Sequence, residues 1–230
     1  MVMHKGLNMI TCGLDNCYVI RGSKGDVLID TGAEERRREI EAWLGGFDVR
    51  LIILTHGHND HIGNAAYFSE LYHAPIMISP YDLRLARDNC CREYFTMPHW
   101  GMTSLGRIIR RENELCMHRQ ATWFDPKIFA VDGMSLAPYG IDGQIIDLEG
   151  HTKGSVGVLC RGEFGLDIYA GDAVMNVLSP SLPMTAESPR RARLTLRSIS
   201  RLLPERILCG HGEPICRGSK GYGKLLDNNS

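Results

Sequence analysis

Long apolar runs are missing from this sequence. None approaches the roughly 20 consecutive apolar residues that a membrane-spanning helix needs. The opening residues 1–6 also lack the uninterrupted hydrophobic segment of a secretory signal. We therefore expect no membrane partner and a cytoplasmic location.

An excess of charge of either sign is missing too. The 26 lysines and arginines nearly balance 27 aspartates and glutamates, which leaves a formal net charge of −1 at pH 7. Proteins that bind nucleic acid or acidic membranes through their overall charge are strongly basic, so composition indicates neither partner. At 230 residues the chain is predicted to form one domain, 1–230.

Paired cysteine motifs are also absent. The eight cysteines contain no C-x-x-C pair and no zinc-ribbon spacing. Without an export signal they are predicted to be reduced thiols, mostly buried as small hydrophobic side chains. Cys209, two residues before His211, is included in this prediction.

Residues 56–61, HGHNDH, hold four potential metal ligands: His56, His58, Asp60 and His61. The apolar run 51–54 before them is typical of a buried strand, and apolar residues after them recur at helical spacing. A loop between a strand and a helix can aim imidazoles and a carboxylate at one point. That ligand set suits zinc, iron or manganese.

Three further candidate ligands are His151, Asp172 and His211. Each lies beside a glycine and follows an apolar, strand-like run. Taken singly, each is explained as an ordinary loop or turn residue. Together with residues 56–61 they predict loops that converge on a common metal centre, with glycine allowing close backbone approach.

The remaining pattern predicts two groups of short strands, each followed by an amphipathic helix. The predicted strands are 7–11, 17–21, 26–30, 51–54, 74–78, a second antiparallel group at 128–131, 145–148, 156–159 and 166–170, and a last strand at 206–209. The predicted helices are 34–44, one from about residue 60, one from Ser79-Pro80, and 188–203.

The pattern breaks down at about 79–127, a stretch of helical character that we predict to be an insertion lying over the site. Its candidates for substrate contact are Tyr81, Trp100, Arg107, His118 and Trp123. Residues 218–230 are predicted to form a flexible tail.

These motifs resemble the metallo-β-lactamase superfamily. The resemblance covers the chain outside 79–127, and its landmarks are Asp30, residues 56–61, His151, Asp172 and His211. It implies an α+β fold, a four-layer αββα sandwich with a helical insertion at about 79–127.

The resemblance also implies two divalent metal ions, with zinc expected and iron or manganese as alternatives. The implied ligands of the first metal are His56, His58 and His151, those of the second are Asp60, His61 and His211, and Asp172 bridges them. Asp30 is implied to orient the ligand loop, although the residues alone equally allow a turn acid after a strand.

The function implied by the resemblance is dinuclear metal-dependent hydrolysis. Two ions about 3.5 to 4 Å apart activate a shared water, so a metal-bridging hydroxide is the expected nucleophile. Asp60 is expected to carry a proton. The expected substrate is an ester, thioester or lactone of a small molecule, and Ser155 is expected to be structural because no base for it is evident.

Departures from familiar members narrow this expectation. β-Lactamases of the family usually carry an export signal and often replace or lack the bridging aspartate, whereas this chain has Asp172. Hydroxyacylglutathione hydrolases add a helical C-terminal region, but only residues 212–230 follow His211 here. Acyl-homoserine lactonases place a tyrosine shortly after the bridging aspartate, where this chain has Ala173-Val174-Met175.

Two alternatives stay open. One is a mononuclear iron persulfide dioxygenase-like oxidoreductase, since imidazole and carboxylate also bind iron. The other is a metal-dependent phosphodiesterase or nuclease, for which the candidate phosphate contacts are Arg107, Arg110, Arg111, Arg190, Arg193, Arg197 and Arg201. Nucleic acid is not the expected partner, because the arginines at 190–201 also fit a solvated helix face. A homodimer is left open.

Overall fold

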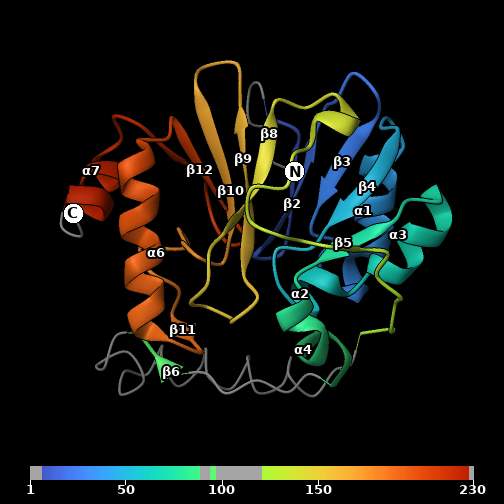
Figure 1. Ribbon diagram of the computed structural model, residues 1–230, viewed down its shortest axis with the longest axis horizontal. Coiled ribbons are helices and arrows are strands. Elements are labelled where there is room, and N and C mark those ends of the chain that lie inside the picture. Colours follow the sequence, from blue (N-terminus) through green and yellow to red (C-terminus); the bar gives the residue numbers. More distant parts are fainter. Residues whose placement is uncertain (1–6, 89–93, 97–120, 228–230) are drawn as a thin grey trace.

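The computed structural model describes residues 7–88, 94–96 and 121–227. Figure 1 shows two β-sheets side by side, with helices on the outer face of each. In the described part of the chain, no helix is both long and apolar enough to cross a membrane.

The first sheet has six strands in the order β1-β2-β3-β4-β5-β7. They are β1 (Met9–Cys12), β2 (Asp15–Ile20), β3 (Asp26–Ile29), β4 (Val49–Ile53), β5 (Ile76–Ile78) and β7 (Ile128–Phe129). β1 to β3 form the antiparallel meander predicted from the sequence, and β3, β4, β5 and β7 run parallel to one another.

The second sheet has five strands in the order β13-β12-β10-β9-β8. They are β8 (Gly143–Asp147), β9 (Val156–Arg161), β10 (Leu166–Gly171), β12 (Arg206–Cys209) and β13 (Ile215–Cys216). β10 and β12 are parallel, and the other neighbouring pairs are antiparallel. A separate pair is formed by β6 (Tyr94–Phe95) and β11 (Thr185–Ala186).

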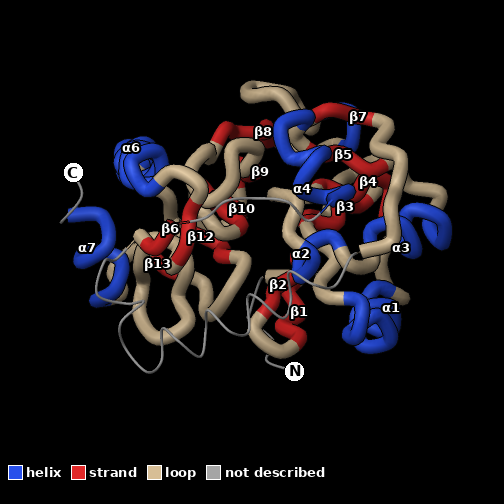
Figure 2. Tube along the Cα trace, turned by 90° about the horizontal axis from the view of Figure 1, so that it is seen from below, coloured by secondary structure: helices blue, strands red, loops and turns tan. Residues whose placement is uncertain are grey.

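Helices cover the outer face of each sheet, as Figure 2 shows from below. On the first sheet these are α1 (Arg37–Leu44) and α3 (Ala65–Tyr72), and on the second α6 (Pro189–Leu202) and α7 (Lys220–Asp227). The shorter helices are η1 (Glu34–Arg36), α2 (Asn59–Ile62), η2 (Pro80–Asp82), α4 (Leu83–Asp88) and η4 (Ala137–Tyr139).

Three hydrophobic layers hold this arrangement together. Along β4 the side chains alternate, so Leu51 and Ile53 pack between the sheets while Ile52 packs under α1 and α3. The third layer lies between the second sheet and α6, where Leu196 and Ile199 are fully buried. Three apolar layers separate four layers of secondary structure, and the predicted αββα sandwich is confirmed.

The helix expected from about residue 60 is divided in two. α2 ends at Ile62 and α3 begins at Ala65. The cause is tertiary: Asn64 Nδ2 donates to the carbonyl oxygens of Thr31 (2.9 Å) and Ala33 (2.9 Å). The chain is therefore tied to the loop after β3 at the point where one helix was predicted.

The run 128–131 was predicted to open the second group of strands, and this was wrong. β7 pairs with β5 in the first sheet, with Met77 opposite Ile128 and Ile78 opposite Phe129. A short apolar run carries no information about which sheet it joins. Here the free edge of β5 accepts it.

The C-terminal tail also differs from the prediction. Residues 220–227 form α7 rather than a flexible tail. Tyr222, Leu225 and Leu226 are buried against the second sheet, and the Tyr222 hydroxyl donates to the Pro204 carbonyl (2.7 Å). Apolar side chains at helical spacing stabilise this segment.

The predicted insertion at about 79–127 is described only in part. Its first residues form η2 and α4, in agreement with the helix start predicted at Ser79, whose hydroxyl accepts from Tyr81 N–H. β6 pairs with β11, which lies after β10 in the chain. Residues 89–93 and 97–120 lie outside the described residues, and in the described stretch 121–127 the side chains of Ala121 and Phe124 are buried in the core beneath α1 and α3.

Candidate metal centre

The candidate ligands lie where strands of both sheets end at one edge of the sandwich. β3 and β4 are parallel, so Asp30 and the loop 54–58 leave the first sheet at the same edge. β10 and β12 are parallel as well, which brings Asp172 and His211 together. His151 lies in the loop before β9, the antiparallel neighbour of β10, and reaches the same edge.

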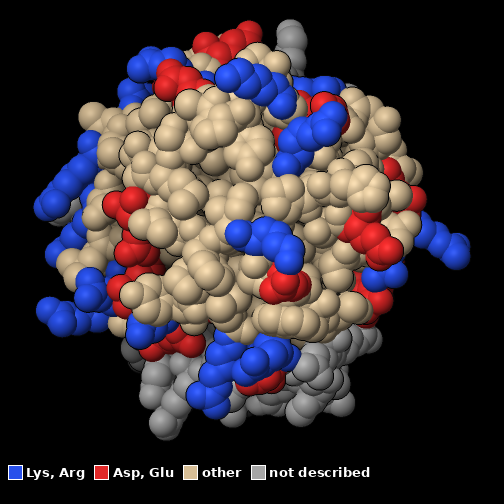
Figure 3. Space-filling view, turned by 45° about the vertical axis from the view of Figure 1, so that its right-hand side comes forward, with Lys and Arg blue, Asp and Glu red and all other residues tan. Residues whose placement is uncertain are grey.

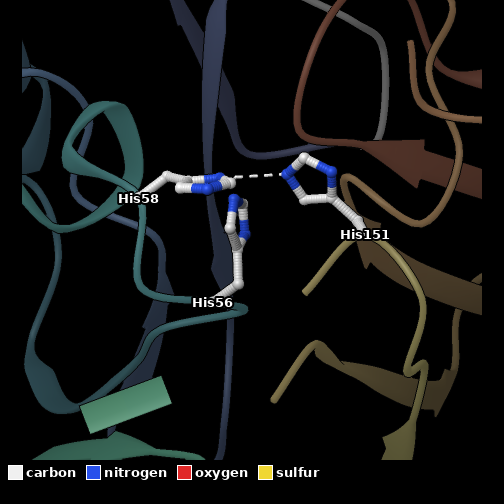
Figure 4. A group of neighbouring side chains, drawn as sticks. All are labelled: His56, His58 and His151. Atoms are coloured by element: carbon white, nitrogen blue, oxygen red, sulfur yellow. Dashed lines mark hydrogen bonds between the residues drawn. The ribbon is translucent and has the colours of Figure 1, made fainter. Parts of the chain in front are cut away.

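Three histidines form a first group. His56 and His58 come from the loop after β4, and His151 faces them from the second sheet (Figure 4). Their ligand nitrogens all lie within 4.8 Å of one another. Nδ1 of His58 is 3.0 Å from Nε2 of His151. The three rings can therefore hold one cation between them.

A second group contains Asp60, His61 and His211. Nε2 of His61 is 3.4 Å from Nε2 of His211, which is 3.4 Å from Asp60 Oδ2. Asp60 and His61 lie on α2, and His211 follows β12. This group also draws its ligands from both halves of the chain.

Asp172 lies between the two groups. Its Oδ2 is 3.1 Å from His211 Nε2 and 3.6 Å from His151 Nε2, while its Oδ1 is 3.5 Å from His61 Nε2. The carboxylate thus approaches one histidine of the first group and two of the second. The sequence-predicted residues are all brought together, with Asp172 at the centre.

The unsatisfied atoms of the centre fit metal binding. His56 Nε2 and Asp172 Oδ1 are buried and have no hydrogen-bond partner. Buried polar atoms without partners are costly, and a bound cation removes that cost. Imidazole nitrogens and carboxylate oxygens are ligands of zinc, iron and manganese, so the donor set fits these metals.

Hydrogen bonds on the far side of the rings orient the ligand nitrogens. The acceptors are Asp30 Oδ2 for His61 Nδ1 (2.8 Å), the Thr185 carbonyl for His151 Nδ1 (2.9 Å) and the Leu14 carbonyl for His211 Nδ1 (3.1 Å). A ring that donates from Nδ1 offers the lone pair of Nε2 to a metal.

Asp30 is both a turn residue and an orienting group. Its φ of 57° is in the left-handed region, where the chain turns after β3. Its carboxylate accepts from the Thr55 N–H (2.8 Å) and the Thr55 hydroxyl (2.8 Å) as well as from His61. Because the Thr55 hydroxyl donates its proton to Asp30, the Thr55 Oγ1 atom can accept a hydrogen bond from His56 Nδ1 (3.1 Å).

Burial and charge oppose each other in setting the pKa values of the centre. Burial lowers the pKa of His61, but the carboxylates of Asp30, Asp172 and Asp60 outweigh it and raise that pKa to about 9. Burial and the neighbouring imidazoles hold the pKa of His56 well below its usual value. The centre without metal therefore carries both a protonated and a neutral histidine at pH 7.

The sequence did not reveal three buried or partly buried polar residues that contact the ligand loops: Asp15, Asn16 and Asp82. Asp15 Oδ1 is 3.4 Å from His211 Nδ1, and burial together with Asp60 raises the pKa of Asp15 to about 6. Asp82 lies in η2, and its carboxylate accepts from the Gly57 and Gly154 N–H groups of the ligand loops. Nothing in the local sequence signals the distant partners of these residues.

Cys209 is a packing residue rather than a ligand. Its side chain is fully buried, and burial and Asp172 raise the pKa of its thiol far above the usual value. Cys12, Cys17 and Cys160 are buried too, whereas Cys216 is exposed. The prediction of buried thiols is confirmed for the first three and for Cys209.

The predicted substrate contacts are only partly placed. Tyr81 and Trp123 are exposed, with 66% and 45% of their surface accessible. The Tyr81 ring lies 4.8 Å from the Lys153 ammonium group. Trp100, Arg107 and His118 lie outside the described residues.

Comparison with known families decides the relationship. The family profile described as the metallo-beta-lactamase superfamily matches residues 10–211. The chain belongs to this superfamily. The match spans every candidate ligand from His56 to His211, and it confirms the resemblance inferred from the sequence.

Several known proteins are similar to this chain over most of its length, and the two solved structures among them share its fold. The "Probable metallo-hydrolase YflN" of Bacillus subtilis (strain 168) is 26% identical over 234 residues, covering 92% of this chain and 85% of that protein. The metallo-beta-lactamase family protein TTHA1429 of Thermus thermophilus superposes with a TM-score of 0.66 at 23% identity, covering 97% of this chain and 79% of that one. TTHA1623, in a di-iron-bound form, gives a TM-score of 0.59 at 24% identity, with 91% and 93% coverage.

Proposed function

We propose that this member of the superfamily is a dinuclear metal-dependent hydrolase of an ester, thioester or lactone of a small molecule. The observation that carries the proposal is the position of Asp172. Its carboxylate lies within 3.6 Å of ligand nitrogens from both groups. A carboxylate so placed is suited to be shared by two cations.

Two bound divalent ions would supply an activated water and polarise the substrate oxygen. His56, His58 and His151 would hold one ion, and Asp60, His61 and His211 would hold the other. Asp172 would be shared by both.

Asp60 is the residue proposed to move a proton. It lies in the first turn of α2, and its side chain retains 33% of its accessible surface, so substrate can approach it. Burial raises the pKa of Asp60, but His61 and His211 outweigh this and hold it far below the usual range. An ionised carboxylate at this position can accept a proton from the attacking water and return it to the leaving group.

Ser155 does not act as a nucleophile in this proposal. Its hydroxyl accepts from the Thr152 N–H (3.0 Å) and lies 2.8 Å from the Thr152 hydroxyl. Both contacts are buried within one loop. This hydrogen-bond pattern fits the structural role expected of Ser155.

On the described face shown in Figure 3, the charge distribution gives no support to a nuclease. On the face shown in Figure 3, lysine and arginine side chains lie interspersed with aspartates and glutamates rather than forming a continuous basic surface. Arg193 of α6 is hydrogen-bonded to the Pro189 and Thr96 carbonyls. The formal net charge of −1 and the mixed charges on this face favour a small-molecule substrate over a polyanion.

The second group of ligands argues against a mononuclear iron centre. The Nε2 atoms of His61 and His211 lie 3.4 Å apart, beside the Asp60 carboxylate. If a single ion were bound at the first group, these three side chains would have no metal to bind. Iron remains an alternative to zinc as the metal, since the donor set suits both.

The test combines a metal count with a substrate panel. Protein purified without added metal is analysed by inductively coupled plasma mass spectrometry and assayed on esters, thioesters, lactones and phosphodiesters. We expect about two ions per chain, as in two-metal hydrolases, and activity confined to carbonyl substrates with little dependence on salt. One iron per chain with oxygen uptake on a persulfide, or activity confined to nucleic acid, would contradict the proposal.

A further inference from the structure

Asp82 is a buried carboxylate that accepts hydrogen bonds from both loops of the first ligand group. Only 1% of its surface is accessible. Its Oδ2 accepts from the Gly57 N–H (2.9 Å) and from the Thr152 hydroxyl (2.7 Å), and its Oδ1 accepts from the Gly154 N–H (2.8 Å).

These three donors flank the first group of ligands. Gly57 lies between His56 and His58 in the chain, and Thr152 directly follows His151. One side chain, which belongs to neither loop, therefore ties the loop from the first sheet to the loop from the second.

The two loops are also joined at their bases. The Val156 N–H donates to the Thr55 carbonyl (2.8 Å), next to β9 and the end of β4. Asp82 adds a second connection close to the ligands themselves. Two connections fix the relative orientation of the loops, whereas one alone leaves a rotation free.

Glycine makes the close approach to Asp82 possible. A Cβ atom on Gly154 would overlap Oδ1 of Asp82. A Cβ on Gly57 would lie 2.9 Å from the Asp82 carbonyl oxygen and 3.0 Å from the Ala86 nitrogen, closer than side-chain carbons normally come. Both loops are therefore shaped to fit against this residue.

Only a carboxylate satisfies all three donors. An asparagine amide has the same size, but one of its two polar ends is an NH₂ donor. Whichever end faces Gly154, at least one N–H or O–H of the loops would then meet another donor. A buried donor left without an acceptor costs about 1 to 3 kcal/mol.

The second group has a different anchor. Asn16 Nδ2 donates to the carbonyl oxygens of Cys209 (3.0 Å) and Gly212 (2.7 Å), on either side of His211. The Asn16 N–H also donates to the Gly210 carbonyl (2.8 Å). Among the described residues, none of the hydrogen bonds of Asp82 reaches this segment. Asp82 and Asn16 thus each support the loops of one group, whereas Asp30 contacts both groups through Thr55 and His61.

We propose that Asp82 is a positioning residue for the first metal: it holds His56, His58 and His151 in the geometry that binds this ion, while the second ion depends on Asn16. The inference rests on the dinuclear centre of the proposed function. Asp82 contacts neither substrate nor the reacting atoms.

The experiment measures the two binding steps separately in the metal-free full-length protein. Cobalt(II) is titrated while its visible absorption, which reports coordination geometry, is recorded, and zinc affinity is measured by competition with a chelator. His58→Ala identifies the step that belongs to the first group. Asp82→Asn is expected to weaken that step by about 10- to 100-fold, as is typical for an outer partner of a ligand, and to alter its cobalt spectrum.

Reciprocal variants make the test specific. Asn16→Ala should weaken the other step and leave the first unchanged. Thr152→Val removes one of the three donors and should weaken the first binding step less than Asp82→Asn does. Thr152→Ser keeps the hydroxyl and should retain wild-type affinity. Asp26→Asn is the matched control, since this buried carboxylate accepts the Asp48 N–H (2.9 Å) at the opposite end of β3.

The outcomes separate this inference from the proposed function. If Asp82→Asn binds both ions with wild-type affinity and an unchanged cobalt spectrum, or weakens both steps equally, the inference is overturned while the dinuclear centre stands. If the wild-type protein binds only one ion, the proposed function fails instead. Should Asp82→Asn not fold, the comparison of Thr152→Val with Thr152→Ser decides, and equal affinities in that pair would overturn the inference.

Discussion

Asp172 is the candidate ligand that lies between the two ligand groups. It follows β10 directly and lies within 3.6 Å of His61, His151 and His211. Burial raises its pKa, but His211 and His61 outweigh this and hold the pKa far below the usual range, so the side chain is ionised at neutral pH. An ionised carboxylate enclosed by histidines is suited to bind cations.

We predict that Asp172→Ala lowers kcat/KM by more than about 100-fold, beyond the loss typical of an outer partner of a ligand, because the residue that joins the two groups is gone. The fold should persist, as judged by an unchanged far-ultraviolet circular dichroism spectrum. Asp26→Ala is the control for removing a buried carboxylate away from the centre. Wild-type turnover in Asp172→Ala would refute the bridging role.

Metal binding to this centre should release protons. His61 has a pKa of about 9 without metal, so it is protonated at pH 7, but a histidine must be neutral to bind a metal. Adding zinc to metal-free protein in weakly buffered solution at pH 7 should therefore acidify it. The release from His61 should diminish as the pH rises through about 9. Zinc binding without acidification at pH 7 would show that His61 does not lose a proton when the metal binds.

Among individual residues, the sequence predicted the candidate metal ligands better than the buried residues that position them. His56 to His61 are adjacent in the chain, and His151, Asp172 and His211 each lie beside a glycine after a strand, so their residue types and positions were informative. Asp82 and Asn16 carry no such signal. Their partners are Thr152 and Gly212, which are 70 and 196 positions away.

The elements bring the ligands together through strand direction. Parallel pairs β3–β4 and β10–β12 send the loops that follow them to the same edge of each sheet. The apolar runs predicted these strands because burial requires them to be hydrophobic. The sheet to which each strand belongs was less predictable. β7 pairs with β5 through backbone hydrogen bonds, which almost any short apolar segment can form.

Two errors at this scale have a common origin in tertiary contacts. The predicted single helix after residue 60 is broken where Asn64 bonds to the Thr31 and Ala33 carbonyls. The predicted flexible tail folds as α7 because Tyr222 and Leu225 are buried against the rest of the molecule. Local sequence contains neither set of partners.

Helix α6 offers a matched test of the outer hydrophobic layer. Leu196 is fully buried against the second sheet, whereas Leu194 on the same helix retains 40% of its accessible surface. Leu196→Ala should lower the free energy of unfolding by about 2 to 5 kcal/mol, the usual cost of emptying a core site. Leu194→Ala should cost much less, and both are measured by urea denaturation of the metal-free protein. Equal losses would contradict the packing of α6.

At the scale of the whole molecule, the candidate metal centre lies between the two sheets. The first group combines residues 56–58 with His151, and the second combines residues 60–61 with His211, so each proposed ion would join segments from both sheets. Binding energy for such ions adds to folding stability, because the unfolded chain has no assembled site. The four-layer architecture was implied by the family resemblance, whereas the residue pattern alone predicted only the strands and helices.

The most direct measurement is anomalous diffraction from a crystal of the metal-loaded protein. We expect two peaks about 3.5 to 4 Å apart, the spacing of two-metal centres. One peak should lie among His56, His58 and His151, the other among Asp60, His61 and His211, and Asp172 should contact both. A single peak, or two peaks of which one lies away from Asp172, would contradict the proposed dinuclear centre.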